Sequence, residues 1–343
     1  MNLWQFGVGA AAGSLSALIF RYRALVNGPF EPTRYVWSRG LALLCDHNGG
    51  VDFVKRQRGG RPAQRFDPTL FDDVRDGDLV WMRLIALPQF LNEALPRIKA
   101  RFALVTGDED WAIPSGFDRA SELWADPRIV CWFTQNFDGT VASGKLMPLP
   151  IGLDFHTISN TRKWGHWPAT PAEQEAELEA LRRAAPPNAQ RLLRVHADFH
   201  FNKHKHQIWG DDRQAVQTAL QGNPDVQFQT TKVSRIDLWR EKTRYAFVVS
   251  PHGNGLDCHR TWESLVLGNI VIVKRSSLDP MYEGLPVVIV EDWREITSDN
   301  LRRWHAEHSS AFGTPAVEER LTNRYWIARM RKIVAERMPV SAA

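Results

Sequence analysis

Cysteine is scarce in this sequence. Its 343 residues include only Cys45, Cys131 and Cys258, and no two of them are spaced as Cys-x-x-Cys. This pattern excludes a zinc-finger or disulfide framework and is typical of a protein in a reducing compartment. We therefore expect a cytoplasmic protein.

A long hydrophobic run is also missing. The only membrane-like segment, Leu3–Phe20, spans 18 residues and is interrupted by Gln5, two serines and three glycines. Its length is near the lower limit for a membrane span, and no basic region precedes it as in a signal peptide. The pattern favours a packed or interfacial helix over a true anchor, which leaves open a peripheral contact with the inner face of a membrane.

Positive charge is present but not concentrated. The net charge is +4 and the pI about 9.0, and the Lys and Arg residues are dispersed along the chain. Nucleic-acid-binding proteins usually carry a basic stripe or an aromatic-basic motif, and neither occurs here, so we expect no nucleic-acid partner. With 24% charged and 10% aromatic residues, the composition is that of a folded protein long enough for two domains.

The stretch Tyr245–Lys274 carries the strongest pattern in the chain. Tyr245–Val249 predicts a buried strand, and a loop with two glycines follows it. A helix is expected to begin near Cys258 and to end at Gly268, and Asn269–Val273 predicts a second, parallel strand. Units of this kind bind ligands at the carboxyl ends of their strands.

The glycine loop and the first turns of this helix hold more polar residues than packing requires. Asp257 is placed to cap the helix, Arg260 to bind a phosphate at its N-terminus, and Glu263, on the same flank, to contact a hydroxylated ring. The predicted ligand-binding residues are His252, Gly253, Asn254, Gly255, Asp257, His259, Arg260 and Glu263. A buried βαβ unit with a capped helix and a glycine turn is the alternative.

These residues resemble the signature of the exostosin-like glycosyltransferases, a strand ending in Pro-x-Gly, then Asp or Ser, Arg, Glu and a Gly-x-(Ile/Val) strand. The matching positions are Ser250, Pro251, Gly253, Asp257, Arg260, Glu263, Gly268 and Ile270–Ile272. The match spans about Phe247–Ile296, and Val271 stands where the family often has proline. The resemblance implies a GT-B fold in which this region holds the nucleotide of a nucleotide sugar.

Further upstream, polar loops follow other predicted strands. Asp108 and Asp110 lie in an acidic loop after the strand Arg101–Val105 and are candidates for the general base that deprotonates an acceptor hydroxyl. An N-cap cluster is the equal alternative for this loop. Gln135 and Asn136, after the next strand, are candidates for binding acceptor sugar hydroxyls, or else serve the loop backbone.

A basic, histidine-rich loop follows a strand at Arg191–Val195. Lys203, Lys205 and Arg213, with Lys274 at the end of a later strand, are expected to neutralise a diphosphate. A rival hypothesis makes this loop a divalent-metal site, although no spacing matches a known zinc motif. The metal-binding candidates are His196, Asp198, His200 and His204.

The alternation of strands and helices predicts an α/β fold with two Rossmann-like domains facing a cleft, as in GT-B enzymes. The expected parts are an apolar helix (1–30), an acceptor-side domain (31–160), a linker (161–190), a nucleotide-sugar-binding domain (191–300) and C-terminal helices that cross back to the first domain (301–343).

The functional hypothesis is a metal-independent glycosyltransferase of polysaccharide synthesis, hexosyl or related, with no cofactor besides its nucleotide-sugar donor. Arg260 and the lysines would stabilise the leaving diphosphate, and Asp108 or Asp110 would activate a hydroxyl of a glycan or lipid-linked acceptor. The alternatives are a metal-dependent hydrolase that uses the histidine-rich loop, and a non-catalytic nucleotide- or glycan-binding protein.

Overall fold

The computed structural model describes residues 33–50, 67–160, 162–199 and 211–338. The segment Leu3–Phe20 and the loop residues Lys203, Lys205, His200 and His204 lie outside these ranges, so their predicted roles are not tested by the structure. Within the described ranges, no helix is long and apolar enough to cross a membrane.

The first half of the chain is built on a four-stranded parallel sheet with the order β1-β2-β3-β4. These strands are Leu79–Arg83, Phe102–Gly107, Ile129–Thr134 and Leu146–Pro148. Every residue of β1 and β2 is buried, as expected for parallel strands covered on both faces. Strand β4 is short, because Pro148 and Pro150 have no N–H to donate to a neighbouring strand.

Short helical segments accompany this sheet. They are α2 (Ser38–Leu44), α4 (Leu87–Gln89) and α5 (Ala120–Ala125), with 3-10 turns at Pro68–Phe71, Leu84–Ala86 and Leu95–Arg97. After α4 the chain forms a π-helical turn, Phe90–Ala94, that passes into the turn Leu95–Arg97. Pro96 accounts for the irregularity, because proline cannot donate a helical hydrogen bond.

The second half contains a five-stranded parallel sheet with the order β6-β5-β7-β8-β9. The strands β5 to β9 are Leu192–Ala197, Val226–Phe228, Tyr245–Val249, Ile270–Lys274 and Val287–Val290. Because the chain runs from β5 to one side and then returns to the other, β5 and β7 flank a switch point where doubly wound sheets bind ligands. Their carboxyl ends lead into Asp198 and Ser250.

Helices connect these strands and link the two halves. They are α6 (His156–Asn160), α7 (Pro171–Ala184), α8 (Asp212–Leu220), α9 (Arg235–Lys242), α10 (His259–Val266) and α11 (Ser298–His308), with 3-10 turns at Asn188–Gln190, Asp279–Met281 and Trp293–Glu295. A capping box begins α7, since Thr170 and Glu173 each bond the other's backbone N–H. Gly268 ends α10 with φ of 83°, a conformation that favours glycine.

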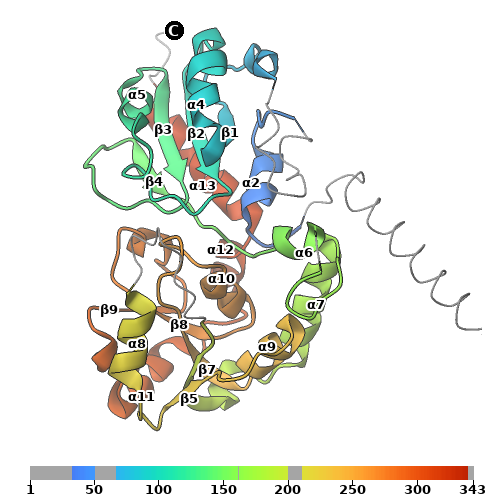
Figure 1. Cartoon of the computed structure of the whole chain (residues 1–343), viewed down its shortest axis with the longest axis vertical. Coiled ribbons are helices and arrows are strands. Elements are labelled where there is room, and N and C mark those ends of the chain that lie inside the picture. Colours follow the sequence, from blue (N-terminus) through green and yellow to red (C-terminus); the bar gives the residue numbers. More distant parts are fainter. Residues whose placement is uncertain (1–32, 51–66, 161, 200–210, 339–343) are drawn as a thin grey trace, which may run out of the picture.

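The last two helices, α12 (Pro315–Arg320) and α13 (Asn323–Arg337), return from the second half to the first. Figure 1 shows α13, in red, beside the β1–β4 sheet. The Val36 N–H donates to the Leu321 carbonyl at 2.9 Å, and α13 packs on α2 and β3. The first half is therefore completed by the chain's C-terminal helix.

The fold class predicted from the sequence is confirmed: two Rossmann-like α/β halves, each with a parallel sheet. The carboxyl ends of the two sheets lead into loops that contact one another, through Asn136 and Gly152 on one side and Asp257 and His259 on the other. A site shared by both halves can form where these loops meet.

Candidate active site

Asp257 holds the two halves together. Its Oδ2 accepts the Ile151 N–H and the Trp262 indole N–H, both at 2.8 Å, and its own N–H donates to Asn136 Oδ1 at 3.0 Å. Asp257 also accepts the Cys258 N–H at 2.8 Å, but the N-cap residue of α10 is Cys258, so Asp257 lies one position before the cap that it was predicted to form. Burial raises the pKa of Asp257 to about 6 despite these hydrogen bonds.

Gln135 and Asn136 are fully buried and serve the loop backbone. Gln135 accepts the Asp108 N–H at 2.9 Å and donates to the Pro150 carbonyl at 3.2 Å, while Asn136 donates to the Glu109 carbonyl at 3.1 Å. The structure therefore favours the alternative role over the predicted contact with acceptor hydroxyls.

Asp108 is an ion-paired carboxylate whose side chain is 2% exposed. Arg83 donates to Asp108 Oδ2 through Nε at 2.9 Å and Nη2 at 2.7 Å, and Arg39 adds a contact at 3.4 Å. Burial alone would raise the pKa of Asp108, but the two arginine charges hold it well below its ordinary value. A carboxylate held in this way is a weak base, and Asp110, the other candidate, is exposed rather than beside it.

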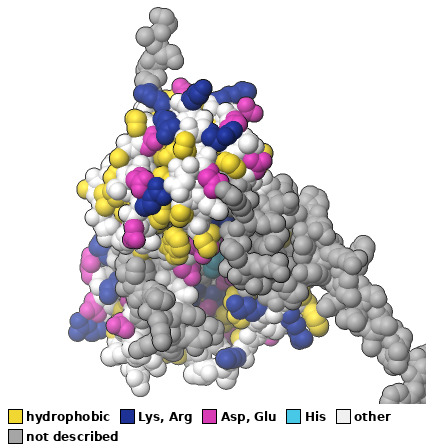
Figure 2. Space-filling model, turned by 45° about the horizontal axis from the view of Figure 1, so that its top comes forward, with side chains coloured by type: hydrophobic (Ala, Val, Ile, Leu, Met, Phe, Trp, Pro, Cys, Tyr) yellow, Lys and Arg dark blue, Asp and Glu magenta, His cyan; other side chains and the backbone are white. Residues whose placement is uncertain are grey.

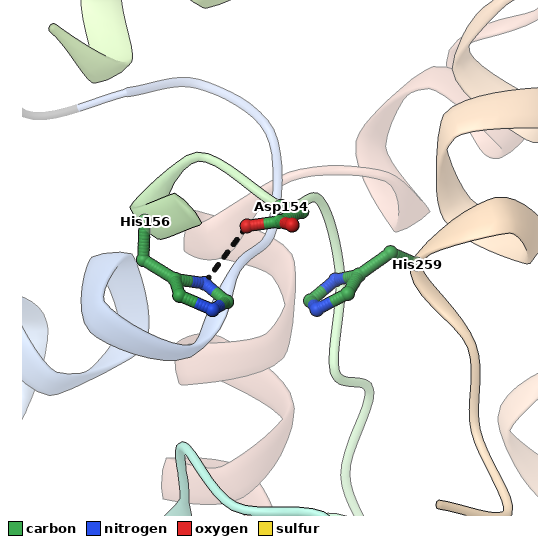
Figure 3. A group of neighbouring side chains, drawn as sticks. All are labelled: Asp154, His156 and His259. Carbon is green, nitrogen blue, oxygen red and sulfur yellow. Dashed lines mark ion pairs between the residues drawn. The ribbon is translucent and has the colours of Figure 1, made fainter. Parts of the chain in front are cut away.

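A group that includes two residues not singled out in the sequence lies where the halves meet (Figure 3). His156 Nδ1 lies 3.1 Å from Asp154 Oδ1, and the rings of His156 and His259 are 5.6 Å apart between centroids. Asp154 also accepts the Thr157 N–H at the start of α6, which fixes its orientation. His259 Nδ1 lies 2.7 Å from the Gly152 carbonyl, so that nitrogen carries the proton and donates.

The charges in this group are unequal. Burial would raise the pKa of Asp154, yet the two imidazoles hold it well below its ordinary value. Burial lowers the pKa of His156, and the nearby Arg39 adds to this against the pull of Asp154. The pKa of His259 is raised, because Asp154 and the Gly152 carbonyl outweigh burial. A carboxylate thus lies between one imidazole biased to the neutral form and one biased to the protonated form.

Two kinds of chemistry fit these three side chains. A neutral imidazole oriented by a carboxylate can accept a proton, and a protonated one can donate a hydrogen bond to oxygen. One ligand atom from each of Asp154, His156 and His259 also lies within 4.8 Å of the others, a donor set that suits a divalent metal. Figure 2 shows histidine side chains in the recess between the halves.

The glycine loop of the second half packs closely against neighbouring side chains. Arg213, at the start of α8, donates to the His252 carbonyl at 3.1 Å. A Cβ on Gly253 would lie 2.6 Å from Arg213 Nη2, and one on Gly255 would lie 2.6 Å from Asn136 Oδ1. Gly255 is therefore required for close approach to the hydrogen-bonded amide of Asn136, whereas a side chain at Gly253 would displace the end of the flexible Arg213 side chain. Asn254 between them is exposed.

Arg260 lies at the switch point between β5 and β7. Its Nε pairs with Asp198 Oδ1 at 2.9 Å, and its Nη1 approaches Ser250 Oγ and the Pro251 carbonyl, each at 3.4 Å. Lys242 holds the other oxygen of Asp198 at 2.8 Å. Burial lowers the pKa of Arg213, and the charge of Arg260 lowers it further. Two guanidinium groups therefore lie near one another beside the glycine loop.

The Asp212 carboxylate connects Lys274 to the backbone of His252 in the glycine loop. Asp212 accepts the His252 N–H at 2.9 Å and the Trp293 indole N–H at 2.7 Å, and Lys274 Nζ lies 3.9 Å from it. Lys274 is the most exposed of these, with 40% of its side chain accessible at the end of β8. The predicted donor residues on β8 and on the glycine loop are thus brought together.

Glu263 faces α9 rather than Arg260. It accepts the Trp239 indole N–H at 3.1 Å and lies 3.9 Å from Lys242 Nζ. The partner of Arg260 is Asp198 instead.

The described part of the histidine-rich segment does not resemble a metal site. His196 is fully buried and packs on the Tyr245 ring, with centroids 5.0 Å apart. Each oxygen of Asp198 is paired with a cation, one with Lys242 and the other with Arg260. A metal ion would have to displace these side chains. Among the described residues, the metal-competent donor set lies at Asp154 instead.

Comparison with known proteins gave weak structural matches. No family model and no curated protein sequence matches the chain. An apo structure of OtsA is 13% identical, with a TM-score of 0.42 over 80% of this chain and 76% of that one. The N-terminal domain of Candida albicans trehalose-6-phosphate phosphatase is 11% identical, with a TM-score of 0.42 over 83% and 78%. A trehalose 6-phosphate synthase from Burkholderia multivorans is 13% identical, with a TM-score of 0.39 over 92% and 84%. At such TM-scores, the fold assignment rests on the chain's own strand order.

Proposed function

We propose that this protein is a glycosyltransferase that moves a sugar from a nucleoside-diphosphate sugar to a hydroxyl acceptor. The observation that carries the proposal is the placement of Arg213 and Arg260 beside the glycine loop, at the switch point of the second sheet. Guanidinium groups bind phosphate oxygens in pairs, and a glycine loop allows close approach of a ligand. His259 of the Asp154–His156–His259 group immediately precedes Arg260 in α10, so the proposed base and the proposed diphosphate site are adjacent.

The donor diphosphate would contact Arg260, Arg213 and Lys274. Asp198, itself paired with Lys242, holds Arg260 in one orientation before the donor binds, which reduces the cost of ordering the guanidinium. Positive charge placed where the leaving diphosphate develops negative charge lowers the barrier to transfer. Lys203 and Lys205, in the segment before α8, are proposed to add to this charge.

The acceptor hydroxyl would lose its proton to His156, which replaces Asp108 and Asp110 in that role. Asp154 orients the His156 imidazole and stabilises the positive charge that forms on it. The lowered pKa of His156 keeps this imidazole neutral near pH 7, as a base requires. His259, whose pKa is raised, is suited to donate a hydrogen bond to a sugar or phosphate oxygen.

The finer predictions from the sequence are part of the same proposal. Resemblance to the exostosin-like family supports a hexosyl or related donor, a glycan or lipid-linked acceptor, and a place in polysaccharide synthesis. A cytoplasmic location with peripheral membrane contact through Leu3–Phe20 is proposed on the composition of that segment.

A metal-dependent hydrolase is a second candidate, and one observation favours it. Asp154, His156 and His259 form a two-histidine, one-carboxylate donor set that could bind a divalent ion and activate water. Such an enzyme would cleave its substrate in the presence of the ion and would transfer no sugar to an acceptor.

The test is a thermal-shift screen with UDP, GDP, CDP and dTDP, followed by measurement of nucleoside-diphosphate release from the matching sugar donors with and without acceptors. A diphosphate present at 100 times its dissociation constant should stabilise the fold by about 2.7 kcal/mol. Arg260→Ala should abolish this shift, whereas Arg302→Ala on the exposed face of α11 should retain it. Absence of stabilisation by every diphosphate would reject the proposal.

A further inference from the structure

Two exposed tryptophans lie three residues apart in the connection that precedes α7. Trp164 is 40% exposed and Trp167 50% exposed, whereas tryptophans such as Trp81 and Trp132 are fully buried in the core. Burial of an indole is strongly favourable, so leaving two of them in water lowers stability unless they contact something else. Within the described ranges, they are the tryptophans found among the exposed large hydrophobic side chains.

The backbone at Trp164 is unusual for so large a side chain. Trp164 has φ of 52° and Gly165 has φ of 70°, and Lys163 pairs with His166 across them. These are the features of a two-residue hairpin turn, where Asn-Gly is the preferred sequence. A bulky residue with positive φ is an outlier that costs conformational free energy. Asparagine at this position would give a more stable turn than tryptophan. The indole is therefore expected to serve a purpose other than stability.

The turn is held rigidly by its surroundings. Lys163 and His166 exchange backbone hydrogen bonds of 3.2 and 2.9 Å, and the Arg235 N–H donates to the Trp164 carbonyl at 3.0 Å. His166 Nε2 also lies 2.8 Å from Glu177 on α7. Strained residues that persist in a well-supported setting are common at binding sites, where they hold a side chain in place before the ligand arrives.

Positive charge accompanies both rings. The Arg162 guanidinium carbon lies 4.2 Å from the Trp167 ring centroid, and Lys163 Nζ lies 4.7 Å from that of Trp164. No carboxylate among the described residues forms an ion pair with Arg162 or Lys163. Each indole thus has a cation over one face and remains 40% to 50% exposed, an arrangement that suits a ligand with flat apolar faces and negative groups.

The turn is connected directly to the candidate active site. Arg235 binds the Trp164 carbonyl through its backbone and the Asp154 carbonyl through Nη1, at 3.1 Å. Its Nη2 donates to Gln174 on α7 at 2.8 Å, so the residue is fixed at both ends. Arg235 therefore links the backbone of the turn to the loop that carries Asp154, beside the proposed base.

We propose that Trp164, Trp167, Arg162 and Lys163 form a binding platform for a carbohydrate chain that carries carboxylate or sulfate groups. The apolar faces of sugar rings stack on the indoles, and the two cations bind the acidic substituents. In the proposed glycosyltransferase this chain is the distal part of the acceptor; that assignment rests on the proposed function, whereas glycan binding by the platform does not.

The test is calorimetric titration of the full-length protein with hexagalacturonate as the acidic probe and maltohexaose as the neutral one. Hexagalacturonate should bind the wild type, and Trp164→Gly, which removes both the ring and the backbone strain, should weaken binding about fivefold to tenfold. Trp164→Tyr, which keeps an aromatic face, should retain most of the affinity. Arg162→Ser should also weaken binding, while Arg302→Ser on α11 should not.

A melting curve separates binding from a structural role. If the indole serves the ligand, Trp164→Gly should melt at the wild-type temperature or above, because the strain is relieved. A melting temperature several degrees lower, or unchanged hexagalacturonate affinity in a folded Trp164→Gly variant, would overturn the proposal. Equal affinity for maltohexaose would reject the acidic ligand, and so would Trp164-dependent binding to phosphatidylserine vesicles without glycan binding. If no nucleoside diphosphate binds but hexagalacturonate does, the proposed function fails and the platform stands.

Discussion

Each half of the molecule places an aspartate at the carboxyl end of a central strand and surrounds it with two cations, but the two arrangements differ in what they leave accessible. In the first half, Asp108 after β2 is enclosed by Arg39 and Arg83, all of them buried. In the second half, Asp198 after β5 pairs with Lys242 and with Arg260, whose side chain is 12% exposed. In the first arrangement every charged group is buried and paired with another. In the second, a partly exposed guanidinium lies beside a glycine loop, where a ligand can reach it.

This difference predicts which mutations affect stability and which affect activity. Charge neutralisation in a closed cluster leaves buried partners unpaired, so it should appear in unfolding experiments. A change to a cation held at a ligand-binding loop should appear in kinetics.

The largest effect is expected from Asp108→Asn. The amide keeps the shape of the side chain but leaves Arg39 and Arg83 without a counter-charge in a buried site, which should cost about 3–5 kcal/mol of stability. Urea unfolding at pH 7 measures it. Asp72→Asn, which breaks the exposed pair with Arg97, is the matched control and should change little.

A near-normal unfolding midpoint in Asp108→Asn would show that the cluster is not structural. The stability of wild type and variant at acidic pH gives a second test of Asp108. Because the folded-state pKa of Asp108 lies below its ordinary value, its stabilising effect is present above about pH 4 and is lost as the pH falls below that value. The variant should therefore lose less stability on acidification than the wild type.

Arg260→Lys tests the cation at the ligand-binding loop, where the effect should appear in kinetics rather than in stability. Lysine retains the charge but cannot offer two N–H groups to one phosphate, so transfer should slow by roughly a hundredfold to a thousandfold, or about 2.7–4 kcal/mol. The loss should lie in kcat if Arg260 stabilises the departing diphosphate, and in KM if it binds the donor equally before and during reaction. Arg302→Lys on α11 should be silent. Normal kcat and KM in Arg260→Lys, with only a lower melting temperature, would make Arg260 a structural residue like Arg83.

Local patterns account for what the sequence predicted well. The strand Tyr245–Val249 agrees to the residue, because five consecutive apolar or aromatic side chains bounded by a turn are read without long-range knowledge. The prediction for Arg260 uses similarly local information, since it lies within a short distance of the glycine loop along the chain.

The missed features depend on contacts distant in sequence. Asp108 was proposed as a base because nothing in its loop shows that Arg39, 69 residues away, would pair with it. Asp154 and His156 were passed over although they follow β4, the position that directed attention to Asp108 after β2. Their relevance appears only when His259, more than a hundred residues later in sequence, lies beside them.

Asp257 should give the fold a pH dependence opposite in sign to that of Asp108. Its pKa is raised to about 6, so the folded state holds a proton that the unfolded chain has released. That stabilisation is present below about pH 4 and is lost as the pH rises to 6, by about 1.4 kcal/mol per unit and about 3 kcal/mol in total. The difference in unfolding free energy between wild type and Asp257→Asn, measured across this range, isolates the effect. A flat difference would mean that the hydrogen bonds from Ile151 and Trp262 keep Asp257 ionised.

The smallest effect is expected from removal of divalent ions. The only group that could bind one among the described residues, Asp154–His156–His259, is surrounded by positive charge. Asp154 already faces His259, whose pKa is raised, and Arg39 adds positive charge near His156, so a cation would have to displace a proton and withstand repulsion. Dialysis against EDTA should therefore leave sugar transfer unchanged, with Arg260 and Arg213 offsetting the charge of the leaving diphosphate. His156→Ala should lower kcat by roughly a hundredfold or more in the same assay, as expected for loss of a base. Loss of turnover on chelation, restored by a single divalent ion and absent from Asp154→Asn, would instead make this group a metal centre and favour the hydrolase.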